Sequence, residues 1–274
     1  MTRRFTWLEG VIIAILLVCA AIMLLPYLWM VLSSFKSNLE IISSATSFVP
    51  QNPTLDGYRA VFEEAPFLTW LLNSAITAVI ITAATLFTSA LAGYVFAKFT
   101  FPGKRLMFLL VLATMMIPFQ VIMIPTYLII SKLGLINNLA AIIVPSLISS
   151  YGVFLAKQFI EDIPRDLLEA ARIDGAGELR IMWRIVMPLI LPMLSALGIF
   201  TFMAAWNNYL WPLIAINDMD RMTVPMALVF FNGAHQVNYN VVMSAAVLIT
   251  LPVIIVFLIF QKQFIKGLTM TGMK

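Results

Sequence analysis

Few side chains in this sequence could do catalytic or metal chemistry. The chain has one histidine, His235, and one cysteine, Cys19. A single histidine without nearby cysteines makes a poor metal site, so we interpret His235 as a solvated loop residue. A Ser/His/Asp constellation is not credible with one histidine. Cys19 lies inside an apolar run and has no second cysteine to pair with, which favours a packing role.

The sequence also lacks the pattern of a phosphate-binding loop. The Gly103-Lys104 pair has neither the upstream glycine nor the following Ser or Thr of G-x-x-x-x-G-K-[ST]. A tight turn after Pro102 explains this pair better. The sequence therefore predicts a chain that is not an enzyme, with no catalytic residue, no metal ligand and no cofactor of its own.

Composition indicates that lipid is the solvent for much of the chain. Of its 274 residues, 62% are hydrophobic and 11% are charged, and the mean hydropathy is +0.98. A soluble domain has about 45–50% apolar and about 25% charged residues. The net charge of +4 would suggest nucleic acid in a soluble protein. Here we attribute it to basic cytoplasmic loops and expect no nucleic-acid partner.

Six segments are long and apolar enough to cross a membrane, since about 20 residues span a hydrocarbon core of about 30 Å. They predict an all-α, polytopic inner-membrane protein with one transmembrane domain over residues 1–274. The first segment is too long for a signal-peptide core and is expected to be retained. The six spans are 11–32, 70–97, 106–128, 138–160, 186–212 and 241–261.

The basic residues predict the orientation of these spans. Thirteen of the 17 Lys and Arg fall in the N-terminus, the 98–105 and 157–184 loops and the C-terminal tail. The four others are Lys36, Arg59, Lys132 and Arg221. The basic side of a membrane protein is cytoplasmic. Both termini are therefore expected on the cytoplasmic side of the membrane. We expect this membrane to be the cytoplasmic (inner) membrane of a bacterium or archaeon.

Several predicted spans contain proline, which removes a helix donor and kinks the chain. Ordinary shaping of a helix bundle explains such kinks. Bending for alternating access is the functional alternative. The residues concerned are Pro118, Pro125, Pro145, Pro188, Pro192, Pro212 and Pro252.

The cytoplasmic segment 161–187 differs from the spans around it. Pro164 suits a helix start, residues 166–173 give about two turns, and Gly175 suits a cap with positive φ. Leu167, Leu168 and Ala171 are expected to share one face. A second helix is expected from near Gly177 to Pro188. A two-turn helix is marginal alone, so it is either an amphipathic connector or a docking helix for a cytoplasmic partner.

The spacing in this segment resembles the EAA loop of binding-protein-dependent ABC importer permeases. The matching residues are Glu169-Ala170-Ala171, Gly175, Ile185 and Met187-Pro188, where the family usually has Leu-Pro. In that family the loop is a coupling helix seated in a cleft of the ATP-hydrolysing subunit. The resemblance implies that role for Glu169, Ala170, Ala171, Asp174 and Gly175.

The resemblance covers nearly the whole chain and is closest to the carbohydrate-uptake branch. The stretches 48–58, 101–104 and 206–212 look like that branch, and 261–269 is similar to the tail of the smaller permease subunit of maltose-type importers. There the tail reaches between the ATPase subunits. The resemblance implies four partners: a homologous second permease, two cytoplasmic ATPase subunits that hold ATP and Mg, and an extracytoplasmic solute-binding protein.

Polar and aromatic residues in the spans suggest where a sugar could pass, since intramembrane polar groups often line a path. An interfacial aromatic belt is the competing interpretation, with Trp211 equally suited to both. The candidates are Asn73, Gln120, Trp206, Asn207, Asn208 and Tyr209.

Two other functions compete with the ABC importer. A secondary transporter driven by an ion gradient predicts intramembrane charges or inverted repeats, and the sequence shows neither clearly. A membrane scaffold without a transport path is the second alternative. Solute flux separates it from a transporter.

Overall fold

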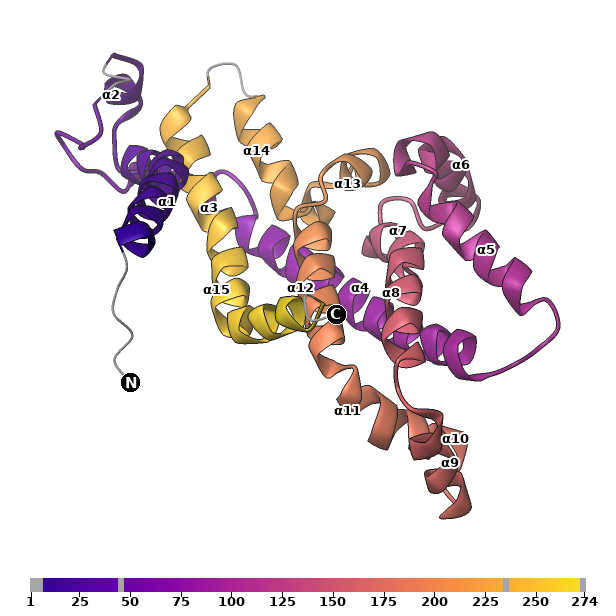
Figure 1. The fold of residues 1–274 in the computed structure, drawn as a ribbon. Helices are drawn as coiled ribbons and strands as arrows, with labels where there is room; N and C mark the ends of the chain where they lie inside the picture. The colour runs from indigo at the N-terminus through magenta and orange to yellow at the C-terminus, as the bar shows by residue number, and fades with distance from the viewer. Residues whose placement is uncertain (1–6, 44–46, 234–236, 272–274) are drawn as a thin grey trace. The chain divides into compact units, whose positions relative to one another are not determined.

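The computed structural model describes residues 7–43, 47–233 and 237–271, with side chains described as far as residue 261. His235, Arg3, Arg4 and Lys274 lie outside the described residues. Every regular element in the described ranges is a helix, which confirms the all-α prediction there (Figure 1). The α-helices are α1 (Trp7–Ser33), α2 (Asn38–Ser43), α3 (Asp56–Glu63), α4 (Phe67–Lys98), α5 (Lys104–Met115), α6 (Phe119–Lys132), α7 (Leu139–Ile143), α8 (Ser150–Glu161), α9 (Arg165–Ile173), α10 (Glu178–Ile181), α11 (Met187–Leu189), α12 (Leu191–Trp206), α13 (Leu210–Ala215), α14 (Val224–Asn232) and α15 (Tyr239–Thr271).

Three short helices of other types join these elements. Val144–Ser146 and Met219–Arg221 are 3₁₀ helices, and Met182–Val186 is a π helix. The chain divides into two compact units. The first comprises Met1–Phe67 and Ala227–Leu251, and the second Leu68–Met226 and Pro252–Lys274.

Four helical segments are each long and apolar enough to cross a membrane. They are Trp7–Ser33, Phe67–Lys98, Leu139–Glu161 and Tyr239–Gln261. Two further candidates are helix pairs, bent by 102° between α5 and α6 and by 77° between Glu178–Leu189 and α12. Length and composition thus allow between four and six spans among the described residues.

The bend between α5 and α6 explains why residues 106–128 are not one straight helix. Pro118 precedes α6 with φ −59° and ψ 138°, an extended conformation. It also lacks the N–H that would continue the hydrogen bonds of α5. Pro125 lies inside α6 without ending it. Of the two prolines in this segment, Pro118 breaks the helix and Pro125 does not.

The predicted 186–212 span is likewise interrupted. Ile190 separates α11 from α12 with φ −93° and ψ 4°, and α12 ends at Trp206. The prediction that the preceding helix ends at Pro188 is wrong by one residue, because α11 includes Pro188 and Leu189. The π helix just before it widens the turn, with the Met187 N–H donating to the Met182 carbonyl. In a regular α-helix the Pro188 ring would clash with the carbonyl four residues back, and the wider turn relieves this clash.

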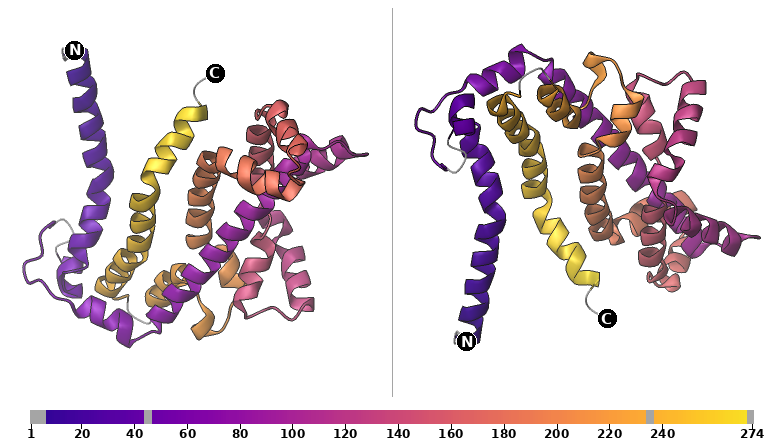
Figure 2. Two further views of the ribbon diagram at one scale, coloured as in Figure 1. Left: turned by 90° about the horizontal axis from the view of Figure 1, so that it is seen from below. Right: turned by 90° about the horizontal axis from the view of Figure 1, so that it is seen from above.

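Helices α4 and α8 of the second unit approach closely along small residues (Figure 2). A Cβ on Gly93 of α4 would lie 2.5 Å from the Cβ of Ala156 and 2.9 Å from its carbonyl carbon. A Cβ on Gly152 of α8 would lie 2.1 Å from the Ser89 hydroxyl oxygen. Small residues four apart on both helices allow this backbone approach, as in membrane helix pairs.

The core of the second unit extends from this contact to the loop after α8. It joins α4, α8, α9, α10 and α12 and is apolar apart from the Tyr94 hydroxyl. The buried members are Ala90, Tyr94, Ala97, Ala156, Ile160, Ile163, Leu168, Ile181, Met182, Val186, Ile190, Met193, Leu194 and Leu197.

The first unit is tied together by polar contacts at the start of α15. The Asn240 amide donates to the carbonyls of Ser34, at 3.0 Å, and Lys36. The Ser34 and Tyr58 hydroxyls lie 2.7 Å apart. Gly57 of α3 leaves no room for a side chain, because a Cβ there would lie 2.1 Å from the Asn240 Oδ1. The segment 33–69 thus contains two short helices, α2 and α3.

The close contact between α4 and α8 predicts opposite effects for two glycine substitutions. Both Gly93→Ala and Gly10→Ala remove a helical glycine, which favours the helix by about 1 kcal/mol. At Gly93 the new methyl meets Ala156, and overpacking costs about 1–3 kcal/mol. Gly10 has open space around its Cβ position. We expect thermal unfolding in detergent to show a lower melting temperature for Gly93→Ala and a slightly higher one for Gly10→Ala. Equal shifts would contradict the close approach.

Candidate functional site

Helix α9 is the centre of the candidate coupling site and projects with α10 beyond the ends of α8 and α11 (Figure 1). It begins directly after Pro164, whose φ of −56° and ψ of 134° place it at the N-cap. Asp166 lies in the first turn, where a negative charge is favoured by the helix dipole. The predicted helix is confirmed, and it begins at Arg165, one residue before the predicted range 166–173.

The end of α9 is fixed by the backbone of Gly175. This residue has φ +79°, as predicted, a conformation that favours glycine. The Ala176 N–H donates to the Ala171 carbonyl at 2.9 Å, and the Gly175 N–H donates to the Arg172 carbonyl at 3.0 Å. These two bonds form a Schellman motif, which satisfies the last carbonyls and reverses the chain toward α10.

The inner face of α9 and the turn after it are anchored to the core by one leucine and two alanines. Leu168 is 1% exposed, and Ala171 and Ala176 pack against the same cluster. Leu167, predicted on this face, is 45% exposed instead. Successive helix residues are about 100° apart, so two adjacent leucines do not both point inward.

A polar bridge ties α9 to α10 and α4. The Arg172 Nε donates to the Glu178 Oε1 at 2.7 Å, and the Tyr94 hydroxyl donates to the Glu178 Oε2 at 2.6 Å. The hydrogen bond with Glu178 raises the pKa of Arg172, so this guanidinium stays charged. Lys98, at the end of α4, donates to the carbonyls of Glu161 and Ile163 just before α9.

The outer face of α9 is left open within the chain. Glu169, Ala170, Asp174 and Gly175 are exposed, whereas Ala171 is half-buried. Two large apolar side chains of the same loop are also exposed. Ile173 is 86% exposed and Leu179 is 71% exposed. Such a group of exposed apolar residues next to charges is typical of a protein-binding surface.

A second feature is a cavity of about 360 Å³ in the same unit. Hydroxyl and amide groups line one part of it, and apolar residues line the rest, namely Ile81 and the α12 residues Leu197, Phe200, Ala204 and Ala205. Tyr151 offers an aromatic ring that is 49% exposed. The polar lining residues are Thr85, Ser146, Ser149, Tyr151, Thr201 and Asn208.

The backbone around this cavity is held by side-chain hydrogen bonds. The Thr85 hydroxyl donates to the Ser146 carbonyl at 3.3 Å, and the Thr88 hydroxyl donates to the Leu147 carbonyl at 3.2 Å. Ser149 caps α8 by accepting from the Gly152 N–H at 3.1 Å. The cavity wall is therefore a fixed junction between α4 and the start of α8.

Of the six predicted path residues, Asn208 alone lines this cavity. The Asn73 amide donates to the carbonyls of Asp220 and Met222, both at 2.9 Å, and so fixes the loop before α14. Trp206 is 2% exposed and stacks on Phe202 with ring centroids 5.8 Å apart.

The other three candidates lie at the surface of the chain. Asn207 is exposed, with its amide donating to the Met203 carbonyl at 2.9 Å. Gln120 is exposed on α6 and Tyr209 is half-buried. Trp211 is buried, and its indole N–H donates to the Ala141 carbonyl at 2.8 Å. The aromatic cluster seen in the sequence thus divides between packing and surface positions.

Thr201 is a cavity residue that sequence reasoning missed. Helical spacing along α12 could have identified Thr201, since residues four and seven positions apart share a helix face. The cavity-lining residues of this helix and its end are Leu197, Thr201, Ala204, Ala205 and Asn208.

Comparison with known proteins identifies the chain. Residues 89–270 match the family described as binding-protein-dependent transport system inner membrane component. The chain belongs to this family. The assignment favours an ABC importer over an ion-driven transporter or a scaffold, and it agrees with a multi-pass protein of the inner membrane.

Curated relatives of this permease are similar over nearly their full length. The arabinooligosaccharides transport system permease protein AraQ of Halalkalibacterium halodurans is 35% identical, over 93% of this chain and 92% of the relative. The lactose transport system permease protein LacG of Rhizobium radiobacter is 32% identical, over 93% of each. The sn-glycerol-3-phosphate transport system permease protein UgpE of Escherichia coli is 31% identical, over 98% of each.

The fold of this permease also matches a solved structure. A chain in the crystal structure of a bacterial ABC transporter that imports the acidic polysaccharide alginate aligns with a TM-score of 0.84. The alignment covers 96% of this permease and 100% of that chain, at 24% sequence identity. The likeness supports the same helical fold.

The backbone at Gly175 predicts a local effect at the end of α9. Gly175→Ala meets no neighbour within 4 Å, so its effect comes from positive φ alone and costs about 1–2 kcal/mol. Gly177→Ala is the matched control, with equally open space and an ordinary φ of −71°. Hydrogen exchange of residues 165–176 is expected to become faster in Gly175→Ala and to stay unchanged in the control. Equal exchange in both variants would contradict the role of this turn.

Proposed function

We propose that this permease is one half of the translocation pore of an ATP-driven, binding-protein-dependent sugar importer. The observation that carries the proposal is the short helix α9, which is anchored on one face and open on the other. Transport of arabinooligosaccharides and lactose by its relatives supports sugar as the solute class. UgpE, named for sn-glycerol-3-phosphate, shows that relatives also differ in solute.

In this proposal the whole chain is one transmembrane domain with six spans and both termini in the cytoplasm. Each of the two bent pairs counts as one span. The bias of thirteen basic residues against four supports this orientation. It places α9 on the cytoplasmic side, where an ATPase subunit can reach it.

The partners are the four that the family resemblance implies. A second permease completes the pore, and two ATPase subunits hold ATP and Mg. An extracytoplasmic solute-binding protein delivers the sugar. A chain with a TM-score of 0.65 to this permease comes from an alginate ABC transporter crystallised with an alginate-bound periplasmic protein, which is consistent with this assembly.

The proposed coupling begins at the open face of α9. Glu169, Ala170, Asp174 and Gly175 meet the cleft of the ATPase, and Ala171 sets how closely α9 packs on its own core. Movement of the ATPase subunits displaces α9 together with α10, because the Gly175 turn and the Arg172–Glu178 bridge hold the C-terminal end of α9.

The displacement has a physical route from α9 to the solute path. Leu168 is buried in a core formed with α4, α8 and α12. The same three helices contribute to the 360 Å³ cavity around Asn208. Close-packed cores transmit shifts because they leave little free volume. Two-state movement of these helices would therefore change the cavity.

The solute path is proposed to include the cavity and its polar lining. Hydroxyl groups and the Asn208 amide can donate to and accept from sugar hydroxyls. The Tyr151 ring can stack on a sugar face. Asn73, Gln120, Trp206, Asn207 and Tyr209 stay predicted path residues, for surfaces completed by the second permease.

Reversing the charge of Glu169 tests the coupling surface. We expect Glu169→Lys to insert normally but to lower ATP-dependent uptake of a labelled arabino-oligosaccharide at least tenfold. The substitution replaces the exposed carboxylate by an ammonium, which presents the opposite charge to the ATPase. Uptake is measured in proteoliposomes that hold the complete complex.

Glu64→Lys is the matched control, since Glu64 is an exposed acid far along the chain from the loop. It should retain uptake and ATPase co-purification. Normal uptake and normal co-purification of the ATPase with Glu169→Lys would contradict the coupling role of α9.

Removing the Asn208 amide tests the solute path separately. Asn208→Ala should lower sugar uptake while the ATPase subunits still co-purify, because the amide lines the cavity and lies outside α9. Asn52→Ala, at an exposed loop position, serves as the control. Uptake that is equal in both variants would remove the cavity from the path.

A further inference from the structure

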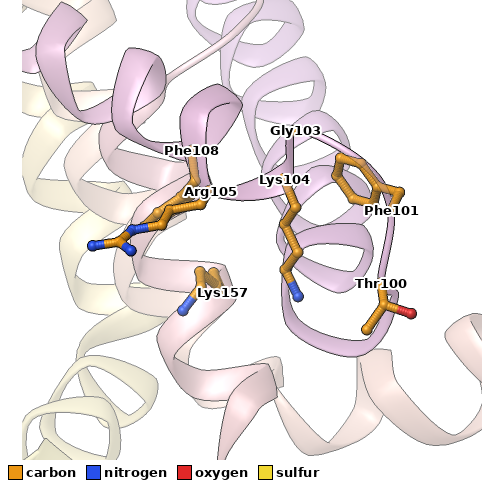
Figure 3. A pocket seen from close by; sticks show the side chains of 7 residues that line it. All are labelled: Thr100, Phe101, Gly103, Lys104, Arg105, Phe108 and Lys157. Atoms are coloured by element: carbon orange, nitrogen blue, oxygen red, sulfur yellow. The ribbon is translucent and has the colours of Figure 1, made fainter.

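A basic pocket lies where the loop after α4 enters α5, apart from α9 and the polar cavity. Its volume is about 530 Å³, and Figure 3 shows its side chains. Three of the seven lining residues are cationic, and the others give apolar or small walls. The lining residues are Thr100, Phe101, Gly103, Lys104, Arg105, Phe108 and Lys157.

Two of these cations stand at an unfavourable place in their helix. Lys104 and Arg105 occupy the first turn of α5, which contains no acidic residue. The helix dipole is positive at this end, so cations there are disfavoured by about 0.3–1 kcal/mol each. An anion in the pocket would reverse this penalty.

The neighbouring acids compensate only part of the positive charge. Lys157 pairs with Glu161, and its ammonium lies 5.0 Å from the centroid of the Phe108 ring. Lys104 donates to the Phe99 carbonyl at 2.8 Å, which leaves its charge uncompensated. Arg105 is exposed. Among the described residues, Glu161 is the one acid that forms an ion pair with a cation of the pocket.

The helix that leaves the pocket is strongly apolar on its outer side. Leu106 is 63% exposed, Leu109 is 51% exposed and Leu110 is 58% exposed. Lipid chains are the natural neighbours of such a surface in a membrane protein. The pocket therefore lies where a polar loop meets an exposed apolar helix face.

We propose that this pocket binds the phosphate headgroup of an anionic phospholipid, with its acyl chains along α5. Lys104 and Lys157 supply point charges, and the Arg105 guanidinium can bind a phosphate through two parallel hydrogen bonds. The apolar side chains of α5 favour a lipid over free phosphate. The site does not depend on which solute is carried or on the role of α9.

Lipid binding by the purified complex tests the proposal. Native mass spectrometry would compare phosphatidylglycerol with phosphatidylcholine of the same acyl chains, added to the detergent-solubilised transporter. We expect tighter binding of phosphatidylglycerol. The double variant Lys104→Gln, Arg105→Gln should weaken it by about fivefold per charge removed.

The control double variant Lys132→Gln, Arg59→Gln removes the same charge from exposed positions elsewhere. It should bind phosphatidylglycerol as the natural chain does, and Arg105→Lys should retain most of the binding. Equal binding of the two lipids, or equal loss in both double variants, would overturn the proposal. Displacement of the lipid by millimolar inorganic phosphate would also overturn it, because it would make the pocket a site for free phosphate.

Discussion

The burial of Leu168 is the contact on which the candidate coupling site depends. A helix of nine residues is marginal in water, because few hydrogen bonds offset the order they require. Full burial of one leucine contributes about 1.5–3 kcal/mol, which is enough to hold such a helix in place. The Gly175 turn and the Arg172–Glu178 bridge then fix how the helix ends. With its inner face satisfied, the outer face of α9 is free to meet another protein.

The sequence could predict this loop well because its signals are local. Pro164, Gly175 and the spacing of Leu168 and Ala171 each act within one or two helical turns. The structure confirms the helix, its end and the positive φ at Gly175. The prediction that Leu167 faces the core is wrong, because two residues adjacent in sequence do not lie on the same face of a helix.

The bends and the cavity were harder to predict because they depend on distant contacts. Hydropathy identifies Pro118 and Pro125 as equal members of one apolar segment, yet a break occurs only at Pro118. Asn73 and Trp206 have the chemistry of path residues, but their environments differ. The Asn73 amide donates to loop carbonyls 147 and 149 positions away along the chain, and the Trp206 indole is buried. Residue type alone does not reveal such partners.

The bend at Ile190 determines the direction in which force travels. The helical segment Glu178–Leu189 meets α12 at 77°, close to a right angle. A push along the axis of that segment therefore reaches the foot of α12 almost entirely as a sideways thrust. A helix pushed sideways at one end tilts about whatever holds its other end, so the push would change the angle between α12 and its neighbours. A straight junction at Ile190 would instead slide α12 lengthwise, without changing the angle between its neighbours.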